Sequence, residues 1–277
     1  NYMAATVFRN AAQWVEDNRG NKPFFLWVDS FSPHEMWDPP RQYADAYFKD
    51  DSVKDYIHHS AMNNHEPSNA EIERTKALYY GYTTFVDRWI GHLLESIDRA
   101  GVADDTVVMF LSDHGTQLMD RGKFGKGGRD LFPFNTQMNW TIRHPDGPRG
   151  KHSDAWVQDQ DVFTTVLKMC GVDHDPGDGL DALALAASGE LGRDHAVTGW
   201  GQFANVRDKR WSAHFDCRGT DAPVVYNLES DPEEIAPVTG VASGVTKEAE
   251  RRLVDVTGER PVAFKQYAQR HVARSMR

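Results

Sequence analysis

The chain has 277 residues, of which 40% are hydrophobic and 26% are charged, and its formal net charge is −10 at pH 7. This composition is typical of a globular protein with a sizeable core and excludes a disordered or low-complexity chain. The acidic balance excludes the basic face that nonspecific nucleic-acid binding requires, and no apolar run approaches the roughly 18 to 20 residues that cross a bilayer.

Two segments near the N-terminus predict a helix followed by a strand. Apolar residues at helical spacing predict a surface helix over residues 4–17, which Gly20 ends. The short apolar run FFLWVDS, residues 24–30, follows Pro23 and predicts a buried strand.

A polar excursion separates this strand from a long helix. Residues 31–67 hold several prolines and histidines, and long loops of this kind are often functional. Ser68 and Glu71 form a capping-box pattern, after which apolar residues continue at helical spacing to near Gly101. Residues 106–112, TVVMFLS, predict a second strand. The order strand, helix, strand indicates an α/β fold.

The remainder of the chain predicts shorter elements. Residues 113–133 have too little apolar periodicity for regular structure and predict a loop. The further elements expected are a strand at 139–143, a helix at 160–170, a short apolar run at 180–187, a small antiparallel sheet within 195–228 and a charged amphipathic helix or pair of helices from about residue 246. We expect an α/β domain over residues 1–195 and a small subdomain over residues 196–277.

Two cysteines, Cys170 and Cys217, are too few for a disulfide framework in a chain of this length, and we expect both to be small buried residues. The start NYMAATVFRN lacks the layout of a signal peptide. We expect a soluble chain, and the compartment stays open between the cytoplasm and the periplasm or the outside of the cell.

The most informative residues, Ser112, Asp113, His114 and Gly115, lie directly after the strand predicted at 106–112. Ligands of open α/β sheets bind outside the carboxyl ends of the strands. A carboxylate oxygen and an imidazole nitrogen together suit a divalent cation such as Mn, Zn or Mg. The structural alternative is that the acidic residue and the histidine form a turn and a cap.

Lys126 lies within GKFGKGGRD, where glycines let the backbone approach a ligand and the ammonium supplies a compact positive charge. Such a loop could hold a sulfate or phosphate oxygen, and the alternative is a solvated basic turn. We expect the neighbouring basic residues to be surface charges: Arg121, Lys123 and Arg129.

His34 follows Ser32 and Pro33 and precedes EMWDPP, whose prolines stiffen the loop. From this position it could donate to an anion or protonate a leaving group, and the alternative is an exposed loop histidine. The other histidines of the excursion match no ligand spacing, and we expect them on the solvated surface: His58, His59 and His65.

In this order, the motifs resemble the sulfatase family within the alkaline-phosphatase superfamily. The segments that carry the resemblance span roughly residues 5–235 and are FFLWVDSFSPHEMWDPP, YYGYTTFVDRWIGHLLESIDRAG, TVVMFLSDHG, GKFGKGG, TIRHPDGP, HSDAWVQDQDVFTTVLKMCGV and YNLESDPEE. The resemblance implies an α/β fold like that of alkaline phosphatase, with a mixed, mostly parallel sheet flanked by helices and a small C-terminal antiparallel sheet and helix.

The resemblance also implies roles for four residues. Asp113 and His114 would be ligands of a divalent metal ion, either Mn, Ca, Mg or Zn, and Lys126 and His34 would be catalytic residues that bind the sulfuryl or phosphoryl oxygens. Such a set neutralises the charge that develops on an anionic ester. The Asp-His pair is similar to the branch that contains phosphonate monoester hydrolases and iduronate-type sulfatases. We expect a sulfate-ester hydrolase, with phosphonate and phosphate mono- or diesters as the alternative substrates.

The chain departs from the family pattern at its nucleophile. Family members begin with a strand that carries adjacent metal-binding aspartates, followed by a C/S-x-P-x-R motif whose Cys or Ser becomes formylglycine, and the sequence contains neither feature. Cys170 and Cys217 lack the proline and arginine of that motif, and Asn139 stands where the family usually has a proline. We expect that a long N-terminal segment is absent from this chain. The third interpretation is a non-catalytic remnant that acts as a binding or structural module.

A parallel sheet without its first strands would expose unpaired backbone and apolar faces. We therefore expect these to be covered, either by the protein's own N-terminal fragment or by a second copy in a homo-oligomer. We expect the substrate to be a small anionic ester, and we expect no nucleic-acid or membrane partner.

Overall fold

The computed structural model describes residues 2–127, 129, 131–218, 222–238 and 243–258. The chain forms two compact units, which are described separately. The first unit comprises residues 1–111, 116–125 and 139–148, and the second comprises residues 112–115, 126–138 and 149–277. Within the described residues, no helix combines the length and the apolar character needed to cross a bilayer. The domain boundary predicted after residue 195 stays a prediction.

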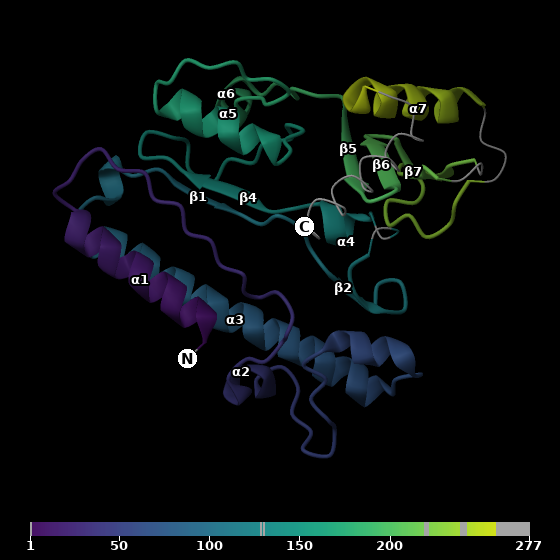
Figure 1. The fold of residues 1–277 in the computed structure, drawn as a ribbon, viewed down its shortest axis with the longest axis horizontal. Helices are drawn as coiled ribbons and strands as arrows, with labels where there is room; N and C mark the ends of the chain where they lie inside the picture. Colours follow the sequence, from purple (N-terminus) through teal and green to yellow (C-terminus); the bar gives the residue numbers. More distant parts are fainter. Residues whose placement is uncertain (1, 128, 130, 219–221, 239–242, 259–277) are drawn as a thin grey trace, which may run out of the picture. The chain divides into compact units, whose positions relative to one another are not determined.

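Two helices, α1 (Met3–Asn18) and α3 (Asn69–Arg99), lie side by side in the first unit (Figure 1). The predicted capping box begins α3, because the Ser68 hydroxyl accepts a hydrogen bond from the Glu71 backbone N–H and the Glu71 carboxylate accepts one from the Ser68 backbone N–H. Val15 of α1 is 1% exposed and packs in one cluster with Ile97 of α3. Both predicted helices are confirmed.

The polar excursion contains the short helix α2 (Arg41–Asp45) and the 3₁₀ helix η1 (His59–Asn64). Helix α2 packs its backbone directly on α3, since a Cβ atom built on Gly81 would lie only 2.5 Å from the backbone nitrogen of Ala44. A glycine is therefore required at this contact, although glycine in a helix interior costs about 1 kcal/mol relative to alanine.

A buried guanidinium fixes the excursion to α3 a second time. Arg74 is 2% exposed and donates to Asp45 at 2.8 Å and to Asp55 at 2.6 Å. These two contacts hold both ends of the span 46–54, so the excursion is docked on α3.

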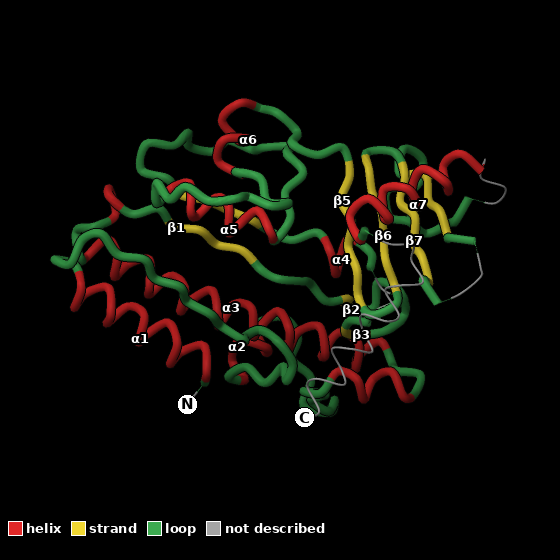
Figure 2. The backbone as a smooth tube through the Cα atoms, turned by 45° about the horizontal axis from the view of Figure 1, so that its top comes forward, coloured by secondary structure: helices red, strands yellow, loops and turns green. Residues whose placement is uncertain are grey.

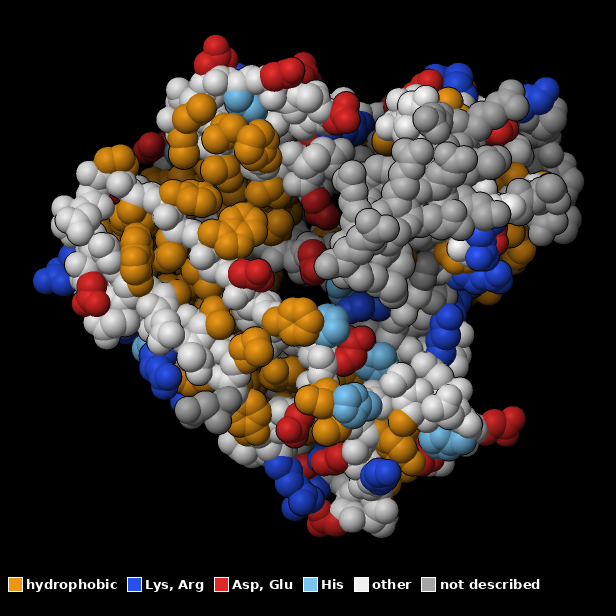
Figure 3. All heavy atoms as spheres, in the orientation of Figure 1, with side chains coloured by type: hydrophobic (Ala, Val, Ile, Leu, Met, Phe, Trp, Pro, Cys, Tyr) orange, Lys and Arg blue, Asp and Glu red, His pale blue; other side chains and the backbone are white. Residues whose placement is uncertain are grey.

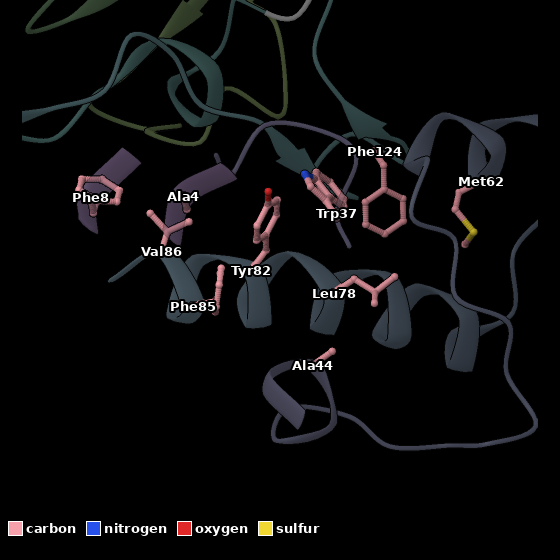
Figure 4. Close-up of a cluster of buried hydrophobic side chains, with 10 residues drawn as sticks. All are labelled: Ala4, Phe8, Trp37, Ala44, Met62, Leu78, Tyr82, Phe85, Val86 and Phe124. Atoms are coloured by element: carbon pink, nitrogen blue, oxygen red, sulfur yellow. The ribbon is translucent and has the colours of Figure 1, made fainter. Parts of the chain in front are cut away.

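The core of the first unit lies between α1, α3 and the excursion (Figure 4). Its buried residues are Ala4, Phe8, Trp37, Ala44, Met62, Leu78, Tyr82, Phe85, Val86 and Phe124. The ring of Trp37 from the excursion lies 6.2 Å from that of Phe124, so residues far apart in the sequence share one core. Burial of this apolar area is the main source of stability, at about 25 cal/mol for each Å² removed from water.

Four strands complete the first unit. The 3₁₀ helix η2 (Ala103–Asp105) precedes β1 (Val108–Leu111), which pairs antiparallel with β4 (Trp140–Arg143). The two-residue strands β2 (Gln117–Leu118) and β3 (Phe124–Gly125) pair within the predicted loop. The strands predicted at 106–112 and 139–143 are confirmed.

The buried strand predicted at 24–30 is wrong. Phe25 and Trp27 are each 63% exposed, Phe31 is 64% exposed, and the segment belongs to no strand. All strand pairs of the described residues are antiparallel, so the mostly parallel pairing that we expected is not found there. The physical reason is that a continuous apolar run is buried on both faces only when neighbouring elements cover it, and among the described residues no strand pairs with this segment. The face drawn in Figure 3 carries a broad area of exposed hydrophobic side chains.

Three helices of the second unit precede its sheet. They are α4 (Pro133–Thr136), α5 (Gln160–Met169) and α6 (Ala182–Ser188). The fully buried carboxylate of Asp161 on α5 accepts two hydrogen bonds from Arg193, at 2.6 and 2.7 Å, and one from the backbone N–H of Leu180, at 2.8 Å. Through Leu180 and Arg193, these contacts of Asp161 connect α5 with the segments on either side of α6.

The predicted C-terminal sheet is confirmed. It is formed by β5 (His195–Trp200), β6 (Phe203–Asp208), β7 (Trp211–Asp216) and β8 (Val224–Asn227), antiparallel in that order, and α7 (Ser243–Thr257) packs against it (Figure 2). Leu253 of α7 is fully buried and packs with Val206 and Ala213 of the sheet. A second terminal helix would lie beyond residue 258, outside the described residues.

A buried carboxylate lies at this sheet. Glu234 is fully buried, accepts a hydrogen bond from Arg207 and lies 2.7 Å from Nε2 of His214. The ring of Phe132 lies 4.6 Å from that of His214.

The two cysteines differ in exposure. Cys217 is 3% exposed, as predicted, but Cys170 is exposed, so the prediction that both are buried is wrong for Cys170. The reason is that α5 ends at Met169, which places Cys170 at the helix C-cap.

Candidate metal and anion site

Asp113 and His114 lie in the turn that follows β1, and their side chains converge. The Nε2 atom of His114 lies 3.5 Å from Oδ2 of Asp113. Nδ1 of His114 lies 2.9 Å from the carbonyl oxygen of Gly115, which can only accept, so Nδ1 carries the proton of this hydrogen bond. In the neutral ring the lone pair is therefore on Nε2, the nitrogen on the Asp113 side.

Hydrogen bonds of the backbone hold this turn. The His114 N–H donates to Oδ1 of Asp113 at 2.9 Å, and the Gly115 N–H donates to the Asn135 carbonyl at 3.0 Å. The Asp113 side chain is 84% exposed and that of His114 is 34% exposed. Both are therefore accessible to a ligand from solvent.

The donor set fits a divalent cation in part. A carboxylate and an imidazole are a common pair of metal ligands. In such pairs the imidazole often donates its Nδ1–H to a carbonyl, and this hydrogen bond leaves Nε2 unprotonated for the metal. The pKa of Asp159 is raised, first by burial and then by the negative charges of Asp113 and Asp161, and a cation at Asp113 would relieve this repulsion. Within the described residues, no group of three or more His, Cys, Asp or Glu side chains is placed to hold a metal, so these residues supply a pair of ligands and not a complete set.

Lys126 directly follows β3 and is half-buried. The backbone before it is fixed, because the side chain of Asn63 donates to the Phe124 carbonyl at 3.1 Å and accepts from the Phe124 N–H at 3.0 Å. The loop that carries Lys126 therefore begins at a strand, β3, whose backbone is held by hydrogen bonds to Asn63. Of the three basic residues expected on the surface, Arg129 is clearly exposed, whereas Arg121 and Lys123 are partly buried.

His34 has a defined environment in the excursion. Its Nδ1 lies 2.9 Å from the Glu35 carbonyl oxygen and 2.8 Å from Glu35 Oε2, and its ring stacks on Phe31 with the centroids 4.3 Å apart. The side chain is 30% exposed. Because both neighbours of Nδ1 are acceptors, Nδ1 carries the proton of this contact, and Nε2 can donate to an anion only when the ring carries a second proton.

Sequence reasoning missed two residues near His34. Glu35 lies between two histidines, and His59, which we expected on the solvated surface, has a side chain only 7% exposed. That expectation is wrong because the ring packs under Trp37, with centroids 4.4 Å apart. His58 and His65 are exposed, as predicted. No spacing rule in the sequence distinguishes His59 from these two.

The structure therefore brings Asp113 and His114 together directly. For His34 and Lys126 the structure defines the local environment of each residue. His34 belongs to the first compact unit, and Asp113, His114 and Lys126 belong to the second.

Comparison with known proteins gives consistent results at three levels. The family model Sulfatase matches residues 1–172. An arylsulfatase of Clostridium perfringens is 28% identical over 256 residues, which cover 83% of this chain and 52% of that protein. The chain thus spans about half the length of the curated relatives it matches.

Two solved structures share the fold. The phosphonate monoester hydrolase of Agrobacterium radiobacter has a TM-score of 0.74 at 21% identity, over 92% of this chain and 60% of that one. A protein solved in complex with its substrate D-glucosamine-2-N,6-O-disulfate has a TM-score of 0.76 at 18% identity, over 92% of this chain and 69% of that one. The architecture is therefore that of the sulfatase and alkaline-phosphatase-like folds.

Proposed function

The chain belongs to the sulfatase family, and from this membership we propose that it is part of a metal-dependent hydrolase of sulfate esters. In this proposal Asp113 and His114 hold the metal, and Lys126 and His34 bind the sulfuryl oxygens of a small anionic ester. The observation that carries the proposal is the convergence of the Asp113 carboxylate and the His114 imidazole directly after β1.

The metal pair would act through its orientation. The hydrogen bond from His114 Nδ1 to the Gly115 carbonyl leaves the lone pair on the other ring nitrogen, Nε2, which lies 3.5 Å from Oδ2 of Asp113. A divalent cation bound there, whether Mn, Ca, Mg or Zn, would supply Lewis-acid stabilisation of the negative charge on an ester oxygen.

Lys126 and His34 would neutralise the remaining oxygens. The Lys126 ammonium is a compact charge at the end of a backbone held by Asn63. His34, with Nδ1–H directed to Glu35, would in its doubly protonated form donate from Nε2 to a sulfuryl oxygen or protonate the leaving group.

We infer that the nucleophile and the remaining metal ligands come from an N-terminal part of the same protein. The chain spans 52% of the arylsulfatase it matches, which supports a longer protein. The exposed side chains of Phe25, Trp27 and Phe31 alternate along one segment, as they would on a strand that another strand or layer covers. A soluble monomer of the 277-residue chain in sedimentation, together with no binding of a hydrophobic dye, would contradict the inference that this face is covered.

One specific observation favours a second substrate class. The fold is shared with a phosphonate monoester hydrolase, and the same pair of metal ligands would suit phosphonate and phosphate esters. Turnover of 4-nitrophenyl phenylphosphonate that exceeds turnover of 4-nitrophenyl sulfate would favour this alternative.

The test of the proposed site is metal content, measured by plasma emission on protein purified without chelators. We expect near-stoichiometric metal in the wild type and loss of it in Asp113→Ala and in His114→Ala. Asp194→Ala is the matched control, because Asp194 and His195 are also adjacent and lie 2.6 Å apart, at the start of β5. Metal that both site variants retain, or equal loss in the control, would contradict the site. Turnover of 4-nitrophenyl sulfate, assayed alongside, tests whether this chain contains a nucleophile.

A further inference from the structure

The imidazole of His59 is a buried polar group that packing alone does not explain. Its side chain is 7% exposed and its ring lies 4.4 Å from that of Trp37, a core residue that Figure 4 shows beside Phe124. Neither ring nitrogen has an aligned hydrogen-bond partner in the described part of the chain. A buried polar group without aligned hydrogen bonds costs on the order of 1 to 3 kcal/mol, so the groups around this ring need an account.

On one side, His59 contacts the residue next to His34. Nε2 of His59 lies 3.0 Å from Oε1 of Glu35, within ion-pair distance. The other carboxylate oxygen of Glu35, Oε2, lies 2.8 Å from Nδ1 of His34. A single carboxylate, 25% exposed, thus lies between a buried imidazole and a partly exposed one.

On the other side, His59 contacts the residue next to Lys126. Gly125 has φ +93°, and a Cβ atom built on it would lie 2.4 Å from Cε1 of His59, so the ring occupies the space where a side chain would be. The same 3₁₀ helix holds the preceding residue, because Asn63 exchanges two hydrogen bonds with the Phe124 backbone. Helix η1 therefore sets the position from which the lysine loop starts.

We propose that His59 is a positioning residue that links the two anion-binding groups: through Glu35 it orients the His34 imidazole, and through its contact with Gly125 it sets the start of the loop that carries Lys126. The inference rests on the proposed function, in which His34 and Lys126 bind the sulfuryl oxygens. It adds a connection between them that neither motif contains. The imidazole combines two properties: its flat ring packs between Trp37 and Gly125, and its Nε2 lies 3.0 Å from a Glu35 carboxylate oxygen.

The first test reads the orientation of His34 without any ligand. Histidine ring nitrogens in the 277-residue chain are observed by ¹⁵N–¹H correlation, and the His34 signals are assigned with His34→Gln. We expect the Nδ1-protonated pattern of His34 to be lost or averaged in His59→Phe, which keeps a flat ring but no nitrogen, and in Glu35→Gln. His58→Phe is the matched control, because His58 is the exposed neighbour of His59, and it should leave the His34 signals unchanged.

The second test uses inorganic sulfate as the probe. Isothermal titration calorimetry of the wild type should show sulfate binding that His34→Ala and Lys126→Ala abolish. His59→Phe should bind about tenfold more weakly, an effect of the size seen on metal affinity when the partner of a metal-bound histidine is changed. His58→Phe should match the wild type.

The outcomes separate the two proposals. Unchanged His34 signals in both His59→Phe and Glu35→Gln would overturn the positioning role, whatever the sulfate titration shows. Sulfate binding that His34→Ala and Lys126→Ala leave unchanged would contradict the proposed function, while the ligand-free signals would still decide the role of His59. If His59→Phe does not fold, the isosteric Glu35→Gln variant gives the decision.

Discussion

Asn63 and Phe124 form two hydrogen bonds that connect side chain to backbone in both directions, at 3.1 and 3.0 Å, across a sequence separation of 61 residues. Phe124 is 2% exposed, so its N–H and C=O groups would be poorly hydrated without Asn63. The contact attaches the excursion to the strand before the lysine loop.

Removing this contact should destabilise the first unit. For Asn63→Ala we expect the free energy of unfolding to fall by about 1 to 2 kcal/mol, since two backbone groups lose their partner. The measurement is urea denaturation followed by tryptophan fluorescence. Asn64→Ala, at the exposed next position of η1, should stay within about 0.5 kcal/mol of the wild type, and equal effects of the two changes would contradict the prediction.

The capping box predicts a specific pH dependence. The backbone N–H of Ser68, its hydroxyl and the hydroxyl of Tyr56 lower the pKa of Glu71 from its ordinary 4.5 to about 2. A lowered pKa means that the stabilisation is fully present above the unfolded value and is lost as the pH falls from about 4.5 toward 2. Glu71→Gln should lack this part of the pH dependence of the melting temperature, whereas Glu73→Gln, in the same turn, should retain it. Parallel profiles for the wild type and Glu71→Gln would refute the assignment.

The buried carboxylate of the C-terminal sheet should stabilise strongly at neutral pH. Burial alone would raise the pKa of Glu234, but the hydrogen bond from His214 and the charges of His214 and Arg207 outweigh burial and lower it. Its contribution is therefore present above the ordinary pKa range of glutamate and is lost as the pH falls through the lowered value. At pH 7 we expect Glu234→Gln to reduce the free energy of unfolding by about 3 kcal/mol, because Arg207 is left without its counter-charge.

Two comparisons test this prediction about Glu234. The difference between Glu234→Gln and the wild type, followed by thermal unfolding, should shrink as the pH is lowered. Glu229→Gln removes an exposed partner of Arg210 and should change stability by less than about 1 kcal/mol. A variant as stable as the wild type at pH 7 would show that the buried charge does not stabilise this sheet.

The two cysteines should differ in reactivity. Burial, and then the charge of Asp216, raise the pKa of the Cys217 thiol to about 11, and the side chain is 3% exposed. Cys170 is exposed. A disulfide reagent such as Ellman's should therefore titrate one thiol in the native protein, none in Cys170→Ser, and both thiols of the wild type after denaturation. Rapid reaction of native Cys170→Ser would contradict the structure at Cys217.

The features that could be predicted from the sequence depend on neighbours in the chain. The capping box at Ser68 and Glu71 is formed by residues three positions apart, and the long helix that follows has its apolar periodicity. The convergence of Asp113 and His114 is likewise local, because the residues are adjacent and follow a strand of recognisable composition.

What could not be predicted depends on distant residues. The burial of His59 is caused by Trp37 and Gly125, on either side of it in the sequence, and its own neighbours His58 and Ser60 are both exposed. The prediction of a buried strand at 24–30 is wrong for the opposite reason. Its apolar residues would be buried only between neighbouring strands, and the described residues provide no strand that pairs with it. In both cases local pattern was a poor guide because tertiary contacts decide burial.

The contact between Gly81 and Ala44 limits how the excursion can vary in length. A shift of one helical turn along α3 would place Ala77 or Phe85 opposite α2, and a side chain at that contact would collide with the Ala44 backbone as a Cβ on Gly81 would. Residues before Ala44 carry His34. Arg74 holds the span 46–54 at its ends, through Asp45 and Asp55, and at the Phe48 carbonyl, so Asp51 lies between the contacts at Phe48 and Asp55. We expect insertion of two glycines after Asp51 to leave the melting temperature nearly unchanged, and the same insertion after Asp38 to lower it. Variation in loop length among related proteins would then be concentrated in 46–54, away from the residues proposed to bind the anion.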